Sequence, residues 1–217
     1  EEDSVSKNIT IAVAGKGGVG KTTFSSLLIG ALRNRKEGSI LAIDADPNST
    51  LAEALGEDTE QTLGAIRDDI LKKKDQLPPG LGKDQYVQLL SHQCIIESSG
   101  YDLVVMGRTE GPGCYCYVNT LLRGFMEDLE PNYRFTVMDN EAGMEHLSRR
   151  TARRVNHLIV VTDGSLASLK AADRIASLMK ELEIETDSSG IILNKGRSAA
   201  RALPDGLELL GEVPEDP

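Results

Sequence analysis

Residues 9–23 read ITIAVAGKGGVGKTT, and this stretch decides the fold. Its first part, residues 9–14, is an apolar run rich in β-branched side chains, which is typical of a buried strand. A glycine-rich segment follows directly, and the apolar residues after it have helical spacing: Phe24, Leu27, Leu28, Ala31 and Leu32. The stretch therefore predicts a strand, a tight loop and a helix in immediate succession.

The loop fits the pattern G-x-x-x-x-G-K-[ST] in the strand-to-helix context that phosphate binding requires. Glycines let successive backbone N–H groups turn inward around an anion, and the following helix directs its positive end at the phosphates. By this logic Lys21 reaches the β- and γ-phosphates, and the Thr22 hydroxyl binds Mg²⁺. The predicted phosphate-binding residues are Gly15, Lys16, Gly17, Gly18, Val19, Gly20, Lys21, Thr22 and Thr23.

Further apolar runs predict a parallel sheet that helices cover on both faces. They occupy residues 40–43, 103–106, 135–138, 158–161, 190–193 and 209–214. These runs lack polar alternation, as buried parallel strands do. Helical patterns between them complete a repeated strand–helix order, so the sequence predicts an α/β fold with one doubly wound, mostly parallel sheet.

At 217 residues the chain is long enough for one substantial core. We expect an acidic, flexible N-terminal extension over residues 1–8 and one nucleotide-binding domain over 9–217. The polar segment 57–98 predicts a helical insertion broken by a surface loop, and residues 91–96 around Cys94 read as helix. We also expect a C-terminal helix to be missing after Pro217.

Composition and charge narrow the classes of partner. The chain is 40% hydrophobic and 27% charged, and its net charge of −10 disfavours binding to nucleic acid or anionic lipid. No uncharged apolar stretch is long enough for a membrane helix, and the acidic start does not resemble a secretory signal, so a cytoplasmic location is expected. Three cysteines make an odd, sparse set, which favours reduced thiols.

A second lysine inside the loop, Lys16, is not needed to hold phosphate within one chain. The segment from Lys16 to Thr23 resembles the deviant Walker A box of the P-loop ATPase family that includes MinD, ParA and the nitrogenase iron protein. In that family the first lysine crosses the interface of a nucleotide-sandwich homodimer to the partner's phosphates. The resemblance therefore implies that Lys16 makes dimerisation and ATP hydrolysis one event.

Two acidic segments follow predicted strands, where doubly wound folds place ligand chemistry. DADPN at 44–48 resembles the first switch of the family, which implies that Asp46 orients or deprotonates the attacking water and that Asp44 holds Mg²⁺ through water. DNEAG at 139–143 resembles the second switch, which gives Asp139 the Walker B role and makes the Gly143 amide a γ-phosphate sensor.

The base of the nucleotide is expected between two later segments. Asn194 and Lys195 follow a predicted strand where this family contacts the base, and main-chain groups near Val213 and Pro214 are expected on the other side. A guanine reader of the N-K-x-D type would carry an acid at position 197, which is arginine here. ATP is therefore preferred over GTP.

Cys114 and Cys116 form a Cys-x-Cys pair, which supplies two thiolates and is too small for a closed four-coordinate site. A two-fold dimer with this segment on its axis would supply four. Four thiolates suit Zn²⁺, Ni²⁺ or an Fe–S cluster, whereas the plain alternative is two ordinary buried thiols. For Cys94 a buried structural thiol is the better reading.

Segments 106–108, 110–116 and 139–150 closely resemble the CooC branch of the family, whose members mature carbon monoxide dehydrogenase. The likeness runs over residues 9–214. It implies an ATP-dependent nickel chaperone that binds nickel or zinc through Cys114 and Cys116 across a homodimer. Its target would be carbon monoxide dehydrogenase or acetyl-CoA synthase.

Two rival functions stay open. One is an electron-transfer component with a shared [4Fe–4S] cluster, like the nitrogenase iron protein, although that branch draws its cysteines from separate segments. The other is a positioning ATPase like MinD or ParA, which needs an amphipathic C-terminal helix or a basic surface. Neither feature is visible in this sequence.

Overall fold

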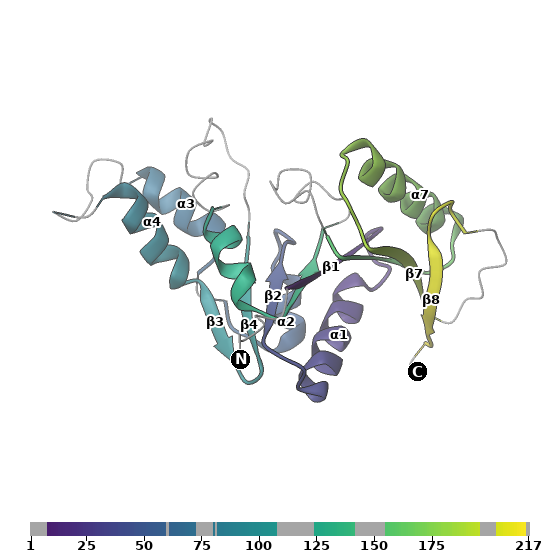
Figure 1. Ribbon diagram of the computed structural model, residues 1–217, viewed down its shortest axis with the longest axis horizontal. Coiled ribbons are helices and arrows are strands. Elements are labelled where there is room, and N and C mark those ends of the chain that lie inside the picture. Colours follow the sequence, from purple (N-terminus) through teal and green to yellow (C-terminus); the bar gives the residue numbers. More distant parts are fainter. Residues whose placement is uncertain are drawn as a thin grey trace, which may run out of the picture.

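The computed structural model describes residues 8–59, 61–72, 80, 82–107, 124–141, 155–195 and 203–215. Its strands are β1 (Ile9–Gly15), β2 (Ile40–Asp44), β3 (Ile95–Ser98), β4 (Tyr101–Val105), β5 (Phe135–Asp139), β6 (His157–Thr162), β7 (Ser188–Asn194) and β8 (Glu208–Val213). Its helices are α1 (Lys21–Arg35), α2 (Thr50–Leu55), α3 (Leu63–Lys72), α4 (Lys83–His92), the 3₁₀ turn η1 (Glu130–Asn132) and α7 (Leu166–Glu181). Figure 1 shows their arrangement.

The strands form one sheet of eight in the order β3-β4-β2-β5-β1-β6-β7-β8. Only the pair β3–β4 is antiparallel among the described strand pairs. This confirms the predicted mostly parallel α/β fold. β1 lies between β5 and β6, so the chain crosses to β2 on one side and later continues to β6 on the other, which creates a switch point beside β1.

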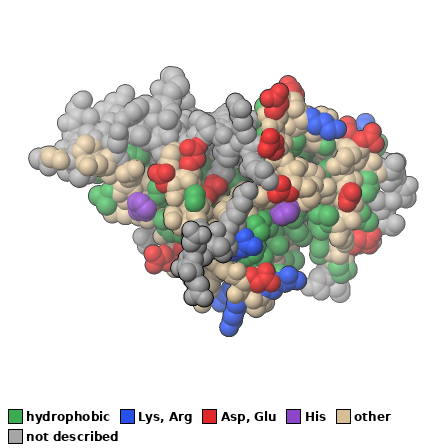
Figure 2. Space-filling model, viewed as in Figure 1, with side chains coloured by type: hydrophobic (Ala, Val, Ile, Leu, Met, Phe, Trp, Pro, Cys, Tyr) green, Lys and Arg blue, Asp and Glu red, His purple; other side chains and the backbone are tan. Residues whose placement is uncertain are grey.

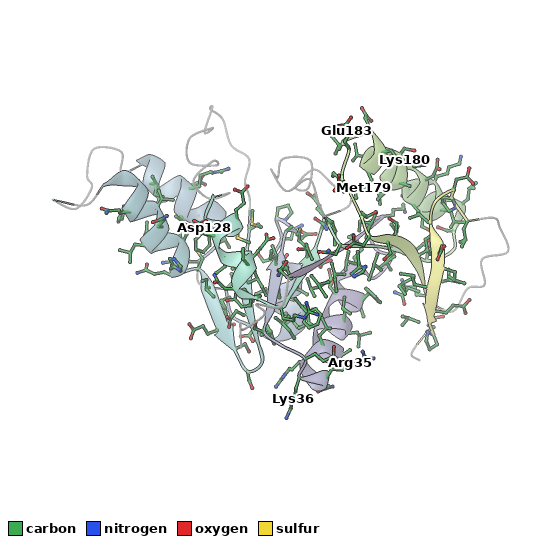
Figure 3. All side chains as sticks on the ribbon, in the orientation of Figure 1. Arg35, Lys36, Asp128, Met179, Lys180 and Glu183 are labelled. Atoms are coloured by element: carbon green, nitrogen blue, oxygen red, sulfur yellow. The ribbon has the colours of Figure 1, made fainter. Side chains whose placement is uncertain are left out.

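Helices cover both faces of the sheet, and each face has its own apolar core. One core joins α3, α4, residues 124–129 and α7 to the sheet, while the other joins α1 and α2 to it. Figure 3 shows the two sides: Arg35 and Lys36 mark the end of α1, and Met179, Lys180 and Glu183 mark the end of α7 across the strands. Because both faces are covered, β1, β2 and β5 carry almost unbroken buried runs.

The predicted insertion holds α3, α4 and a strand that the sequence did not suggest. Residues 91–96 were expected to be helical, and this expectation is wrong, because α4 ends at His92 and Ile95 and Ile96 belong to β3. Cys94 lies at this junction, 1% exposed within the core, so its reading as a buried thiol is confirmed. Burial raises the pKa of that thiol to about 12.

Residues 1–7 of the expected N-terminal extension lie outside the described residues, but Asn8 is fixed. Its amide nitrogen donates to the carbonyl oxygens of Glu130 and Tyr133, at 3.0 and 2.9 Å, and so fastens the start of β1 to the turn before β5. Within the described parts of the chain, no helix is long and apolar enough to cross a membrane.

Candidate functional site

The loop between β1 and α1 has the backbone that the glycine pattern predicted. Gly18 and Gly20 have φ values of +79° and +92°, in the left-handed region that side chains disfavour. Gly20 has a second reason to be glycine, because a Cβ atom there would collide with the amide nitrogen of Asn194. The loop therefore delivers the chain to Lys21, the first residue of α1, through a path that only glycine allows at position 20.

The two lysines of the loop lie in different surroundings. Lys21 is 8% exposed, and its Nζ atom donates to the carbonyl oxygen of Lys16 at 3.4 Å. Lys16 itself is exposed at the surface of the loop. Lys21 is thus buried beside the loop, where a nucleotide bound to the same chain would have its phosphates. Lys16 is exposed and points to no such enclosed position.

Asp139 ends β5 directly beneath the first turns of α1, and its carboxylate is 1% exposed. Its Oδ2 atom accepts from the Thr22 hydroxyl at 2.7 Å, and its Oδ1 atom accepts from the Ser25 hydroxyl at 3.1 Å. Burial raises the pKa of Asp139, while the two hydroxyls and the charge of Lys21 act to lower it. The structure therefore brings Thr22 and Asp139 together, as the motif predicts.

Asp44 ends β2 and is fully buried, but its contacts differ from those of Asp139. Its Oδ2 atom accepts from the backbone N–H groups of Leu51 and Ala52, at 2.9 and 3.1 Å, and its Oδ1 atom accepts from that of Asp46 at 3.1 Å. The carboxylate therefore caps α2 and fixes the turn that precedes it. Burial raises the pKa of Asp44 to about 6, although these amides lower it.

Asp46 lies two residues further along this turn and is only half-buried. Its Oδ1 atom accepts from the backbone N–H of Asn48 at 2.8 Å and from the Asn48 side-chain amide at 3.1 Å. Among the described residues no donor bonds the other carboxylate oxygen, Oδ2, and Asp46 lines the cavity over the loop. Of the two aspartates in segment 44–48, Asp46 is thus the one that lines the cavity.

Asn194 and Lys195 close the site from the end of β7. The Asn194 amide nitrogen donates to the carbonyl oxygen of Val19 at 2.8 Å, and the Lys195 Nζ atom reaches the carbonyl oxygen of Gly18 at 3.4 Å. Lys195 has a φ of +65°, a strained value for a residue with a side chain. Asn194 therefore supports the phosphate loop itself, a role that the sequence alone did not suggest.

A cavity of about 830 Å³ opens over the loop. Its volume suits a small-molecule ligand such as a nucleotide. It brings together residues from the loop, both acidic segments and the ends of β7 and β8, since Val213 pairs with Asn194. The lining residues are Gly17, Gly18, Gly20, Lys21, Thr22, Thr23, Leu27, Asp46, Thr50, Glu141, Asn194, Lys195, Val213, Pro214 and Glu215.

Several lining residues were not expected from the sequence. Leu27 was read as part of the apolar face of α1, yet it is 55% exposed and faces the cavity. The buried face of α1 instead carries Ser25 and Ile29, so the periodicity predicted the helix but not its orientation. Glu141 and Glu215 also line the cavity, and only their positions beside Asp139 and Pro214 could have suggested this.

Three predicted site residues, Cys114, Cys116 and Gly143, lie outside the described residues. Within the described ranges, no group of three or more His, Cys, Asp or Glu side chains is placed to hold a metal ion. The thiolate site thus stays a prediction from the sequence.

Comparison with known proteins agrees with this geometry. Residues 10–217 match the family described as the CobQ/CobB/MinD/ParA nucleotide binding domain. The chain is 46% identical to an uncharacterized ATP-binding protein of Methanocaldococcus jannaschii, over 94% of this chain and 83% of that protein. It is 31% identical to the carbon monoxide dehydrogenase accessory protein CooC of Rhodospirillum rubrum, over 95% of this chain and 83% of that protein.

Solved structures share the fold at lower identity. The septum site-determining protein MinD of Pyrococcus horikoshii, in complex with Mg-ADP, superposes with a TM-score of 0.64 at 21% identity, over 96% of this chain and 82% of that one. A ParA family ATPase from Chlorobium tepidum gives a TM-score of 0.67 at 21% identity, over 96% and 85% of the two chains. The fold, the phosphate loop and the sequence match together establish that this chain belongs to the CobQ/CobB/MinD/ParA family of P-loop nucleotide-binding proteins.

Proposed function

We propose that this protein is an ATPase that works as a nickel or zinc chaperone for carbon monoxide dehydrogenase or a related nickel enzyme. The single observation that carries the ATPase part is the cluster of Lys21, Thr22 and Asp139 beneath an open cavity. The M. jannaschii relative is named an ATP-binding protein, which favours ATP as the nucleotide. The likeness to CooC supports the chaperone part.

The described residues fit a magnesium–nucleotide complex. The Thr22 hydroxyl donates to Asp139. The Thr50 hydroxyl lies 3.3 Å from the Thr22 hydroxyl and is placed to donate to it. A hydroxyl has one proton and two lone pairs, so Thr22 keeps one lone pair for a cation. Oxygen donors of this kind are the ligands that Mg²⁺ prefers, and when bound the ion would neutralise charge on the phosphates.

The chain's own groups supply the remaining steps of hydrolysis. The backbone N–H groups of the loop and the buried Lys21 hold the phosphates, which positions the terminal one for attack. Asp46 faces the cavity and is the residue we assign to orienting or deprotonating the attacking water. Asp44, whose carboxylate caps α2, holds the turn that carries Asp46 and so acts on the water only through it.

The metal cargo would bind to Cys114 and Cys116 of two copies of the chain. Lys16 is exposed on the loop, which is what a residue needs if it is to reach the phosphates of a partner subunit. In this scheme ATP closes a homodimer, the four thiolates hold nickel or zinc as cargo, and hydrolysis reopens the dimer at the target enzyme. Coupling is then reciprocal, so bound metal also strengthens ATP binding.

Metal stoichiometry per dimer tests this function directly. The native chain, a Cys114→Ala/Cys116→Ala variant and a Cys94→Ala control would be loaded with nickel in the presence of ADP or ATP and analysed for elements. We expect one nickel per dimer in the native chain and in the control, because Cys94 is buried in the core, and none in the double variant. Unchanged nickel in the double variant, or iron and sulfide in the native protein, would reject the chaperone assignment.

ATP-dependent binding to DNA or liposomes would instead favour a positioning ATPase. On the face in Figure 2, Lys and Arg side chains of the coloured residues lie in small separate groups rather than one broad surface. A protein that holds nucleic acid or anionic lipid needs such a surface. The net charge of −10 also disfavours such binding, so we expect no ATP-dependent retention on either.

A further inference from the structure

Ser25 is a buried hydroxyl that neither the motif nor the proposed mechanism uses. It lies one turn beyond Thr22 on α1 and is 0% exposed. A serine within a helix commonly donates to the carbonyl oxygen four residues earlier. The Ser25 hydroxyl donates instead to the Oδ1 atom of Asp139, at 3.1 Å. This bond joins the nucleotide-binding helix to the end of β5.

The bond completes the anchoring of the Asp139 carboxylate. Thr22 and Ser25 are three residues apart and therefore share one face of α1, and each donates to a different oxygen of the carboxylate. Asp139 is 1% exposed, so bulk water does not stand in for either donor. Two donors on separate oxygens fix the plane of the carboxylate, whereas Thr22 alone would hold only Oδ2.

The orientation of this carboxylate determines what the Thr22 hydroxyl offers to a cation. Because Thr22 gives its proton to the Oδ2 atom of Asp139, its lone pairs point away from the carboxylate. If Asp139 turns, that proton loses its acceptor and the hydroxyl can rotate as well. The residue that holds Oδ1 in place therefore also holds the lone pair that faces the cavity.

We propose that Ser25 is a positioning residue that fixes the Asp139 carboxylate and thereby sets the affinity of the nucleotide site for Mg²⁺. The proposal rests on magnesium–nucleotide binding in the proposed function, and it is independent of nickel and of dimer formation. Outer-shell hydrogen-bond partners of metal ligands typically change metal affinity by about 10- to 100-fold when removed. The weaker anchoring of Ser25, at 3.1 Å, favours the lower end of that range.

Fluorescence titration with N-methylanthraniloyl-ADP, first in EDTA and then in Mg²⁺, measures this effect without relying on turnover. In the native chain we expect tighter binding in Mg²⁺ than in EDTA. In Ser25→Ala we expect the same affinity in EDTA but a gain on adding Mg²⁺ that is smaller by about tenfold. Unchanged affinity in EDTA also shows that the variant is folded, because the phosphate loop must be formed to bind the nucleotide.

Two further variants serve as controls. Ser25→Thr keeps the hydroxyl and should retain the native gain. Ser26→Ala removes a neighbouring hydroxyl that donates to the carbonyl oxygen of Thr23 at 2.9 Å on the exposed side of α1, and it should also behave as native. A native gain in Ser25→Ala, or an equal loss of affinity in EDTA and in Mg²⁺, would overturn the proposal. Failure of the native chain to bind the nucleotide at all would instead refute the proposed function.

Discussion

The ends of β2 and β5 place two buried aspartates side by side, yet the protein satisfies them in different ways. Asp44 and Asp139 are register partners in neighbouring parallel strands, and they are 0% and 1% exposed. Backbone N–H groups of its own segment hold Asp44, whereas side-chain hydroxyls from α1 hold Asp139. Asp44 therefore builds local structure, while Asp139 joins the end of β5 to the hydroxyl groups of the helix that follows the phosphate loop.

The largest effect expected from this contrast is on the pH dependence of the free energy of unfolding. Burial raises the pKa of Asp44 from 3.8 to about 6, so between these values the folded chain holds a proton that the unfolded chain has released. This contribution to stability is complete below pH 4 and is lost as the pH rises through about 6, a change of about 3 kcal/mol. Urea unfolding of the native chain from pH 4 to 7, without Mg²⁺ or nucleotide, measures it.

The matched comparison is Asp44→Asn, which removes the titrating group but keeps the shape of the side chain. Its free energy of unfolding should fall less steeply over the same pH range. The difference between the two slopes reports Asp44 together with its repulsion by Asp139, whose charge helps to raise the pKa of Asp44. Parallel curves for the two proteins would mean that the backbone N–H groups keep Asp44 ionised throughout.

Asp139→Asn tests the other aspartate through activity. The amide can still accept from one hydroxyl, but it lacks the charge that attracts Mg²⁺, so we expect ATP hydrolysis to fall by about 100-fold. The free energy of unfolding should change by less than about 1 kcal/mol, because the side chain keeps its shape. Steady-state phosphate release and urea unfolding measure the two. A variant that loses stability and activity together would show that Asp139 is as structural as Asp44.

Asp44→Ala should produce the reverse pattern. Three backbone N–H groups lose their acceptor, and the start of α2 loses its cap, so stability should fall by about 2 kcal/mol. Mg²⁺-dependent nucleotide binding should survive at temperatures where the variant is folded, because Thr22 and Asp139 are untouched. Thermal unfolding and nucleotide titration at a low temperature separate these effects. Loss of binding in the folded variant would make Asp44 a direct participant.

The smallest effect is expected at a hydroxyl contact between α1 and α2. Thr50 begins α2, and its Oγ1 atom lies 3.3 Å from that of Thr22. Thr50→Val preserves the shape of the side chain and removes this long bond, so Mg²⁺-dependent binding should weaken by about threefold, with stability almost unchanged. Binding that weakens by more than about tenfold would mean that the α2 region is energetically part of the Asp139 site.

The sequence could predict features that depend on local pattern. Residues 9–14 and 135–138 are mostly apolar, as is typical of strands with both faces covered, and the glycine spacing of the loop predicts a phosphate site. It could not predict β3, since Ile95 and Ile96 continue the apolar spacing of α4 and only pairing with β4 makes them a strand.

The sequence likewise could not predict contacts between segments that are far apart along the chain. The Ser25 hydroxyl reads in sequence as an ordinary polar position within a helix, and its acceptor is 114 residues away. For Asp44 the sequence predicted a water-mediated contact to the cation, which stays a prediction, but it did not suggest that the carboxylate also accepts from backbone N–H groups at the start of α2. The hydrogen-bond partner of a buried polar group depends on tertiary packing, and the periodicity of a single sequence does not predict that partner.

The contact between Gly20 and Asn194 has a consequence for how the protein can change over time. Position 20 must remain glycine both for its φ of +92° and for the space that the Asn194 amide occupies, although the two residues are 174 positions apart. A smaller residue at position 194 would relieve only the second of these constraints and would release the Val19 carbonyl oxygen from its donor. A change at position 194, in the segment after β7, would therefore alter the support of the phosphate loop at Val19 without freeing position 20 from its need for glycine.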